Sequence, residues 1–267
     1  MVPTLSDRPM ATLSEARDAF QLRLLTFLYR GSTGSSLVLK GGAAMRVLTE
    51  SARFTQDLDF DHDPHRSLAS LQKTVRTAID RAIQGSGLVG TAISESKQTD
   101  TVARWKIFGR TSTGESLHLR VEVSRRRAPD LRRVLKIPVQ IADRTLPRVY
   151  VSVYDEQALA DNKLAALIDD RRTAPRDIYD LELLLARGIV PSVAAVDNLG
   201  GQAKLIQRIA DKLDLMSWAL FRDEVVPTLP VEIHAHIDED EYLAMKVRLL
   251  ETLERSLAKN AGDAGSS

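Results

Sequence analysis

Two aspartates one residue apart, Asp57 and Asp59, are the side chains of this chain best placed to do chemistry. Residues i and i+2 of a strand point to the same face of a sheet. If residues 56–60 form a strand, the two carboxylates lie side by side, and Leu58 and Phe60 point to the opposite face. Neighbouring carboxylates repel each other, and a bound cation relieves that repulsion. Because Mg²⁺ prefers oxygen ligands from carboxylates and substrate phosphates, the pair predicts a magnesium site.

A double glycine, Gly41-Gly42, precedes these acids in the chain. It follows residues 36–40, which have the apolar character of a buried strand, and it leads into a short helix expected over residues 43–49. Glycine allows the backbone to turn sharply and to approach a phosphate closely, and the first N–H groups of a helix favour an anion. The order strand, glycine turn, helix and acidic strand therefore predicts a phosphate site beside a metal site.

The residues around both features form two longer motifs. The stretch from Leu39 to Arg46 is Leu-Lys-Gly-Gly-Ala-Ala-Met-Arg, and the stretch from Arg53 to Phe60 is Arg-Phe-Thr-Gln-Asp-Leu-Asp-Phe. Together they resemble the nucleotidyltransferase superfamily and, more closely, the AbiEii/AbiGii-type nucleotidyltransferase toxins, a group that includes the MenT toxins of mycobacteria. Gly-Gly alone is weak evidence, and so is Asp-x-Asp alone, whereas the two together at this spacing, with both arginines, are fairly specific.

A second segment carries the same resemblance. Lys163-Leu164-Ala165-Ala166 is followed by Arg-Asp-Ile-Tyr-Asp-Leu over residues 176–181, similar to a lysine helix and a later acidic helix start in the toxins. The resemblance implies that Lys163 binds nucleotide phosphates, as a compact cation can, and that Asp177 is a further essential acid. Asp180, one helical turn later, is the alternative acid. Helix capping and surface ion pairing are the ordinary explanation for such a segment.

Four further residues have two interpretations each. Glu122, within the strand-like run 117–124, is either a third metal ligand or a solvent-facing strand residue. Thr55 shares the expected face of the acids, and the resemblance places it in the active site, although threonine is also an ordinary strand residue. Arg46 and Arg53 either clamp phosphate or pair with nearby acids.

The resemblance implies a Mg²⁺-dependent enzyme that transfers a nucleoside monophosphate from an NTP to an acceptor hydroxyl. Its members suggest the 3′ end of tRNA as the acceptor, and a role as the toxin of a toxin–antitoxin or phage-defence pair, with a cognate antitoxin as partner. Two alternatives remain open: a nucleotidyltransferase that modifies a protein or small molecule, and a non-catalytic nucleotide-binding protein.

Composition, net charge and the lack of long apolar runs limit the classes of protein to which the chain can belong. The 267 residues include no cysteine, which excludes disulfides and thiolate metal sites, and the net charge is +1. The N-terminus lacks the apolar core of a signal peptide, and no apolar run approaches the roughly 20 residues that span a bilayer, so we expect a cytoplasmic protein without membrane contact. A local basic run either binds RNA or is a solvated face: Arg120, Arg125, Arg126, Arg127, Arg132, Arg133 and Lys136.

The remaining patterns predict an α+β protein, with an α+β domain over residues 1–150 and a helical domain over residues 151–267. The resemblance implies that the first domain is nucleotidyltransferase-like, with a mixed sheet and flanking helices. Ser14 is the expected cap of the first helix, and Thr113-Gly114-Glu115 is the expected turn of a hairpin. We expect helices over 13–30, 66–84, 155–169, 176–187, 201–220 and 238–258, strands over 102–108, 117–124, 135–141 and 149–153, and a disordered tail over 261–267.

Overall fold

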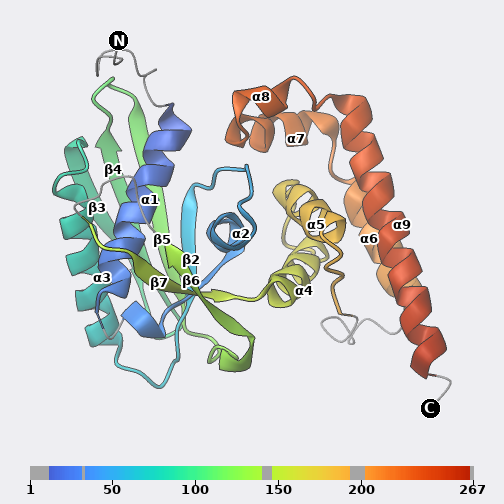
Figure 1. Ribbon diagram of the computed structural model, residues 1–267, viewed down its shortest axis with the longest axis horizontal. Helices are drawn as coiled ribbons and strands as arrows, with labels where there is room; N and C mark the ends of the chain where they lie inside the picture. Colours follow the sequence, from blue (N-terminus) through green and yellow to red (C-terminus); the bar gives the residue numbers. More distant parts are fainter. Residues whose placement is uncertain (1–11, 32–33, 140–145, 193–201, 265–267) are drawn as a thin grey trace, which may run out of the picture. The chain divides into compact units, whose positions relative to one another are not determined.

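The computed structural model describes residues 12–31, 34–139, 146–192 and 202–264, and it divides into two compact units (Figure 1). The first, here called the sheet unit, comprises Met1–Leu39, Phe54–Leu131 and Leu135–Val153. The second, the helical unit, comprises Lys40–Arg53, Arg132–Val134 and Tyr154–Ser267. The chain therefore enters the helical unit early, between the first strand and the acidic strand, before it returns to complete the sheet.

A mixed sheet of seven strands, in the order β3-β4-β5-β2-β1-β7-β6, forms the centre of the fold. Strand β2 pairs with β5 and β1 pairs with β7 in parallel, whereas β3, β4 and β5 form an antiparallel meander. This arrangement confirms the predicted fold class. The strand bounds are β1 Val38–Lys40, β2 Asp57–Asp61, β3 Val89–Gln98, β4 Val102–Arg110, β5 Ser116–Ser124, β6 Val134–Val139 and β7 Val149–Tyr154.

Helices α1 (Leu13–Tyr29) and α3 (Leu68–Ile83) belong to the sheet unit and pack against its apolar face. Every second residue of β4 and β5 contributes to this core, and Trp105, Ile107 and Val121 are completely buried. The other residues of the same strands point away from the helices, as a sheet with one solvated face requires. The predicted cap of α1 is wrong by two residues: Thr12, not Ser14, accepts the hydrogen bond, because Glu15 completes a capping box with it.

Strand β3 is an element that the sequence patterns do not predict. Its residues are small, polar and mostly exposed, because β3 lies at the edge of the sheet, and two shifts of register interrupt its pairing with β4. Because almost none of its residues is buried, its sequence lacks the regular alternation of apolar and polar residues that indicates a strand. The predicted turn at Gly114, in contrast, joins β4 to β5 as expected, with a positive φ of 86° at the glycine.

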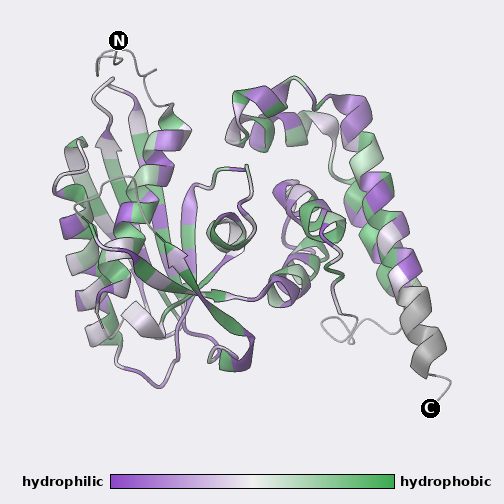
Figure 2. Cartoon of the chain, viewed as in Figure 1, coloured by the Kyte–Doolittle hydropathy of each residue, from purple (hydrophilic) through white to green (hydrophobic). Residues whose placement is uncertain are grey.

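The helical unit consists of helices packed around a core of its own that includes Leu181, Ile209, Phe221 and Tyr242. The coloured part of α9 carries both hydrophobic and hydrophilic residues (Figure 2), and its Tyr242, Met245, Leu249 and Leu253 belong to this core. The helix bounds are α2 Gly41–Thr49, α4 Glu156–Leu167, α5 Arg176–Ala186, α6 Gln202–Asp214, α7 Trp218–Glu224, α8 Val231–His234 and α9 Glu239–Ala264.

Two details of this unit differ from the sequence predictions. The single helix expected over residues 201–220 is interrupted, because the Ser217 side chain accepts a hydrogen bond from the Leu220 N–H and begins a new helix, α7. A disordered tail is expected from residue 261, but α9 continues to Ala264. Residues 265–267 of this expected tail lie outside the described residues. None of the helices in the described part of the chain is both long and apolar enough to cross a membrane.

Candidate active site

The two acids of β2 lie on one face of the strand, as their spacing predicts. Leu58 and Phe60 are fully buried in the core of the sheet unit, whereas Asp57 and Asp59 point to the opposite face and are partly exposed. The cause is the period of two of the strand, which forces the acids outward once the apolar residues are buried. Two carboxylates therefore share one accessible surface of the sheet.

Strand β5 lies beside these acids in a parallel register that pairs Asp57 with Arg120 and Asp59 with Glu122. The Arg120 Nη2 atom is 2.5 Å from Asp57 Oδ2. Glu122 accepts a hydrogen bond from Arg104 Nε at 2.8 Å and lies 2.6 Å from Arg104 Nη2. Asp57 and Glu122 are thus each next to an arginine of a neighbouring strand.

These contacts affect whether the Glu122 carboxylate is available as a third metal ligand. Its carboxylate is on the same face as Asp57 and Asp59 and directly beside Asp59 in the register, but Arg104 engages it at two points. Within the described residues, no group of three or more His, Cys, Asp or Glu side chains is gathered closely enough to hold a metal ion. The predicted role of Glu122 as a ligand stays a prediction.

Thr55 lies two residues before the start of β2 and is buried. Its hydroxyl oxygen is 3.4 Å from the Asp57 backbone nitrogen, and its carbonyl accepts a hydrogen bond from Gln21 Nε2 at 2.9 Å. The first contact is local and involves the backbone of the acidic strand. The second connects the segment before this strand to Gln21 of helix α1. In this geometry Thr55 positions the backbone of Asp57.

The double glycine forms the first turn of α2, in the helical unit, so the helix begins two residues earlier than predicted. Gly41 has a φ of 67°, a left-handed conformation that favours glycine. Lys40, which occupies the N-cap position, makes no side-chain cap. The N-cap side chain therefore leaves the first N–H groups of α2 uncapped, and such groups favour an anion.

The two arginines of the motifs make contacts within the helical unit. Arg46 Nη1 donates a hydrogen bond to the Ser51 carbonyl at 2.8 Å, bracing the loop after α2. Arg53 is buried and forms a two-point contact with Asp180: Nε to Oδ1 at 2.9 Å and Nη2 to Oδ2 at 2.7 Å. Of the two interpretations of Arg53, pairing with an acid is the one that the structure shows.

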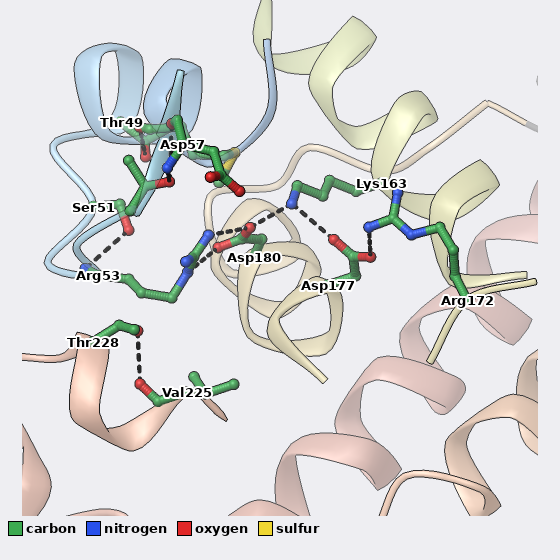
Figure 3. Close-up of polar contacts among 12 residues, drawn as sticks. Thr49, Ser51, Arg53, Asp57, Lys163, Arg172, Asp177, Asp180, Val225 and Thr228 are labelled. Carbon is green, nitrogen blue, oxygen red and sulfur yellow. Dashed lines mark hydrogen bonds and ion pairs between the residues drawn. The ribbon is translucent and has the colours of Figure 1, made fainter. Parts of the chain in front are cut away.

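A buried ion cluster connects Arg53 to the second motif (Figure 3). The Lys163 ammonium lies between two carboxylates, 2.8 Å from Asp177 Oδ1 and 2.6 Å from Asp180 Oδ2. Arg172 Nη2 is 3.2 Å from Asp177 Oδ2. The cluster thus joins Lys163, Arg53 and Arg172 to the two carboxylates.

Burial and pairing act in opposite directions on these groups. Burial alone would lower the pKa of Lys163, but the nearby Asp180 and Asp177 carboxylates outweigh it and raise that pKa. Burial would raise the pKa of Asp180, yet Lys163 and Arg53 outweigh it and lower that pKa to about 2. Lys163 and Asp180 are therefore both charged at neutral pH, which is the state in which buried ions are compensated.

Both candidate acids of the second motif lie in α5. Asp177 is in the first turn of this helix and Asp180 is one turn later, and both are almost completely buried. Helix capping does not explain Asp177, because its carboxylate is directed to Lys163 and Arg172. Surface ion pairing does not explain Asp180, because that residue has no exposed surface.

The predicted basic run does not form one free surface. Arg125 is buried and donates to the carbonyls of Pro64 and Arg66, and Arg133 contacts Asp155 and Asp161. Arg120 contacts Asp57. Sequence proximity of arginines is a poor indicator of a surface, because neighbouring residues of a strand or loop point in different directions.

A different set of residues lies on the face that carries the acids. Strand β4 presents Arg104, Lys106, Phe108 and Arg110 on this face, and β5 adds His118. Sequence reasoning missed these residues, although residues 102–110 alternate between apolar and polar types. That alternation does not by itself indicate a binding surface, because it is typical of any half-buried strand.

The mixed sheet, with two carboxylates on the outward face of one strand and a glycine-led helix before it, defines a nucleotidyltransferase-like protein. Solved structures support this fold. JHP933 from Helicobacter pylori has a TM-score of 0.60 and 21% identity, with 97% of this chain and 99% of that chain covered. A second H. pylori protein, described as a nucleotidyltransferase, has a TM-score of 0.56 and 24% identity, with 91% of this chain and 96% of that chain covered.

A family model described as "Nucleotidyl transferase AbiEii toxin, Type IV TA system" matches residues 23–259. The chain belongs to this family of toxin nucleotidyltransferases from type IV toxin–antitoxin systems, as the motifs predicted. MenT4, a nucleotidyltransferase toxin from Mycobacterium tuberculosis, is also similar, with a TM-score of 0.46, 18% identity, and 92% of this chain and 95% of that chain covered. No curated protein matches the chain.

Proposed function

We propose that this protein transfers a nucleoside monophosphate from an NTP to the 3′ hydroxyl of an RNA, in particular tRNA, in the presence of Mg²⁺. In this reaction the acceptor oxygen forms a bond to the α-phosphorus, the bond from that phosphorus to the bridging oxygen breaks, pyrophosphate leaves, and the hydroxyl proton is released. A nucleotide added to the end of tRNA blocks aminoacylation, which accounts for toxicity. The cognate antitoxin is the expected partner, as the type IV family implies.

One observation carries the proposal: Asp57 and Asp59 lie on the same outward face of β2 and are accessible. Their donor set fits Mg²⁺, because both supply carboxylate oxygens and neither is buried in the core. When bound, the ion would neutralise the triphosphate and favour ionisation of the acceptor hydroxyl. Without a metal, Arg120 compensates Asp57, so the same carboxylate has a cationic partner in either state.

Taken by itself, the helical unit has two features that are suited to bind phosphates. The first turn of α2, led by Gly41 and Gly42, offers N–H groups that no side chain caps. Lys163 and Arg172 are cations of the same cluster, and the Arg172 side chain is 42% exposed, so that it is accessible to an anionic ligand. Asp177 and Asp180 hold the Lys163 ammonium in place from two sides.

Incubation of the purified protein with α-³²P-labelled NTPs, Mg²⁺ and either bulk tRNA or a protein extract tests this function. We expect label on tRNA, its loss with EDTA, and its loss in Asp57→Asn and Asp59→Asn. Label on protein alone would support the protein-modifying alternative. Absence of label on every acceptor with all four NTPs would support a non-catalytic nucleotide-binding protein.

A further inference from the structure

The face of the sheet that carries Asp57 and Asp59 continues across β5 and β4 to the edge strand β3. Alternate residues of β4 point to this face, whereas Ala103, Trp105 and Ile107 between them are buried in the core. The antiparallel register places Lys106 beside Arg120, and Phe108 beside His118. On the other side, Ser94 of β3 is beside Lys106. A continuous row of outward side chains thus leads from the acids to the edge of the sheet.

Charge is distributed unevenly along this row. The acids of the face are on β2 and β5, and one of them, Glu122, is compensated by Arg104. Farther out, Lys97, Lys106 and Arg110 are exposed, and their side chains form no ion pair or hydrogen bond with any residue that the structure describes. An ordinary solvated face carries charges of both signs in neighbouring positions. Here the uncompensated charges are all positive, which favours a polyanionic ligand.

Two rings lie within the cationic region. The Phe108 and His118 ring centroids are 5.1 Å apart with an angle of 78° between planes, an edge-to-face pair across β4 and β5. Phe108 is half-buried and His118 is exposed. The pair is therefore accessible at least at His118. Flat, accessible rings among cations are the combination that binds single-stranded nucleic acid, because bases stack on the rings while the cations contact phosphates.

The distance between the acids and the cationic region suits an RNA acceptor whose 3′ end lies at Asp57 and Asp59. Two inter-strand steps separate Asp57 from Lys106, and each step is about 4.8 Å, so the cationic region begins roughly 10 Å from the carboxylates. Nucleotides immediately before a 3′-terminal hydroxyl at Asp57 and Asp59 can therefore extend over β5 and β4. A duplex is too wide and too stacked to place its bases on these rings.

We propose that the outward face of β3, β4 and β5 binds the single-stranded 3′ end of the RNA acceptor, with Lys97, Lys106 and Arg110 on phosphates and the Phe108–His118 pair stacked against a base. This assignment rests on the proposed function for the identity of the acceptor. It places RNA recognition on alternate residues of the β4–β5 hairpin and not on the arginine run of residues 125–133.

The main test is charge reversal at two exposed positions, Lys106→Glu together with Arg110→Glu. The matched control is Lys73→Glu with Arg81→Glu, which makes the same change of charge at exposed positions of α3, on the other side of the sheet. Binding is measured by fluorescence anisotropy with a short fluorescein-labelled single-stranded RNA that has a free 3′ hydroxyl, at several salt concentrations. The full chain carries Asp59→Asn in these measurements, so that binding is read independently of transfer.

We expect the β4 variant to raise the dissociation constant for this RNA at least 10-fold. We also expect a weaker salt dependence, with the log–log slope reduced by roughly 0.7 for each phosphate of the single strand that the variant no longer neutralises. The α3 control is expected to change the dissociation constant by less than 3-fold. Phe108→Leu with His118→Ala, which removes stacking but keeps an apolar side chain at the half-buried position 108, is expected to weaken binding 3- to 10-fold with an unchanged salt slope.

Three outcomes would overturn the assignment: equal weakening by the β4 and α3 variants, no weakening by either ring or charge variant, or equally tight binding of a blunt RNA duplex. The outcome for the proposed function is separate. If the wild-type chain transfers nucleotides to tRNA while the β4 variant keeps the same KM for tRNA, the reaction stands and this surface is wrong. If RNA binds through β4 but no transfer occurs, the surface stands and the reaction is wrong.

Discussion

The two groups of acids in this protein differ in burial and in partners. Asp57 and Asp59 of the sheet unit are partly exposed on a strand, and Arg120 contacts the first of them from the neighbouring strand. Asp177 and Asp180 of the helical unit are almost completely buried and are enclosed by Lys163 and two arginines. An exposed carboxylate can exchange one cationic partner for another at little cost, whereas a buried one depends on the partners it has. The first pair is therefore suited to substrate and metal, and the second to holding a lysine in place.

The largest expected effect is a loss of nucleotide transfer when Asp57 or Asp59 is replaced. Asp57→Asn or Asp59→Asn removes one negative charge from the proposed metal site without changing the shape of the side chain. We expect nucleotide transfer to fall by about 10³-fold or more, about 4 kcal/mol of transition-state stabilisation, while the free energy of unfolding changes by less than about 1 kcal/mol. Transfer assays and urea unfolding of the same preparations measure the two quantities. A variant that unfolds far more easily than the wild type would show that these acids are structural.

The next largest expected effect is a decrease in the free energy of unfolding when Arg53 of the buried cluster is replaced. Arg53→Met leaves the Asp180 carboxylate with Lys163 alone in a buried environment. Loss of one partner of a buried ion pair costs about 3–5 kcal/mol. Urea unfolding followed by far-ultraviolet circular dichroism, which the helices dominate, is the measurement.

Arg172→Met is the matched control for this cluster. Arg172 contacts the other acid, Asp177, but its side chain is 42% exposed. We expect a loss of less than about 1 kcal/mol, because solvent screens the exposed partner. Equal costs for the Arg53 and Arg172 variants would contradict the difference in burial on which the comparison depends.

A smaller effect is expected from pH. The pKa of Asp180 is lowered from 3.8 to about 2 in the folded chain, so the unfolded chain binds the proton more tightly. Its contribution, on the order of 2 kcal/mol, is present above the unfolded pKa of 3.8 and is lost as the pH falls toward 2. The unfolding free energy of the wild type should therefore decrease more steeply between about pH 5 and 2.5 than that of Asp180→Asn. Parallel pH curves for the two proteins would be inconsistent with an ionised Asp180.

The smallest effect is expected at Thr55. Thr55→Val keeps the shape of the side chain but leaves the Asp57 N–H without the threonine oxygen. Because that contact is long, 3.4 Å, we expect a loss of about 1 kcal/mol in the free energy of unfolding. Activity should fall by less than in Asp57→Asn, since the carboxylates remain. A loss of activity equal to that of Asp57→Asn would instead indicate that the hydroxyl contacts the substrate.

Local patterns were sufficient for much of the fold and for the acidic strand. The period of two around Asp57 predicts both the strand and the shared face of the acids, because each strand residue points opposite to the next. Helix periodicity located α1, α3, α4, α5 and α9 within a few residues at most of their ends. Strand β3 could not be predicted in this way, because it acquires its structure by pairing with β4 and its own residues carry no such periodicity.

The contacts of the charged residues depend on more than local patterns. Arg53 and Asp180 are 127 positions apart, and neither residue alone indicates that both are buried and paired. The arginine run at residues 125–133 indicated a basic surface, but Arg125 and Arg133 are engaged by carbonyls and acids of their own units. Arg120, which lies in the same part of the sequence, is instead beside Asp57.

The amino-acid sequence by itself determined the family, most of the helices and the pair of acids on one strand face, because each of these depends on residue types at short spacing. Tertiary structure alone decided which charges are compensated and which are available: Asp180 enclosed by Lys163 and Arg53, and Lys106 exposed on the sheet. The physical reason is that the state of an ionic group depends on burial and on partners brought close by folding, and these come from distant parts of the chain.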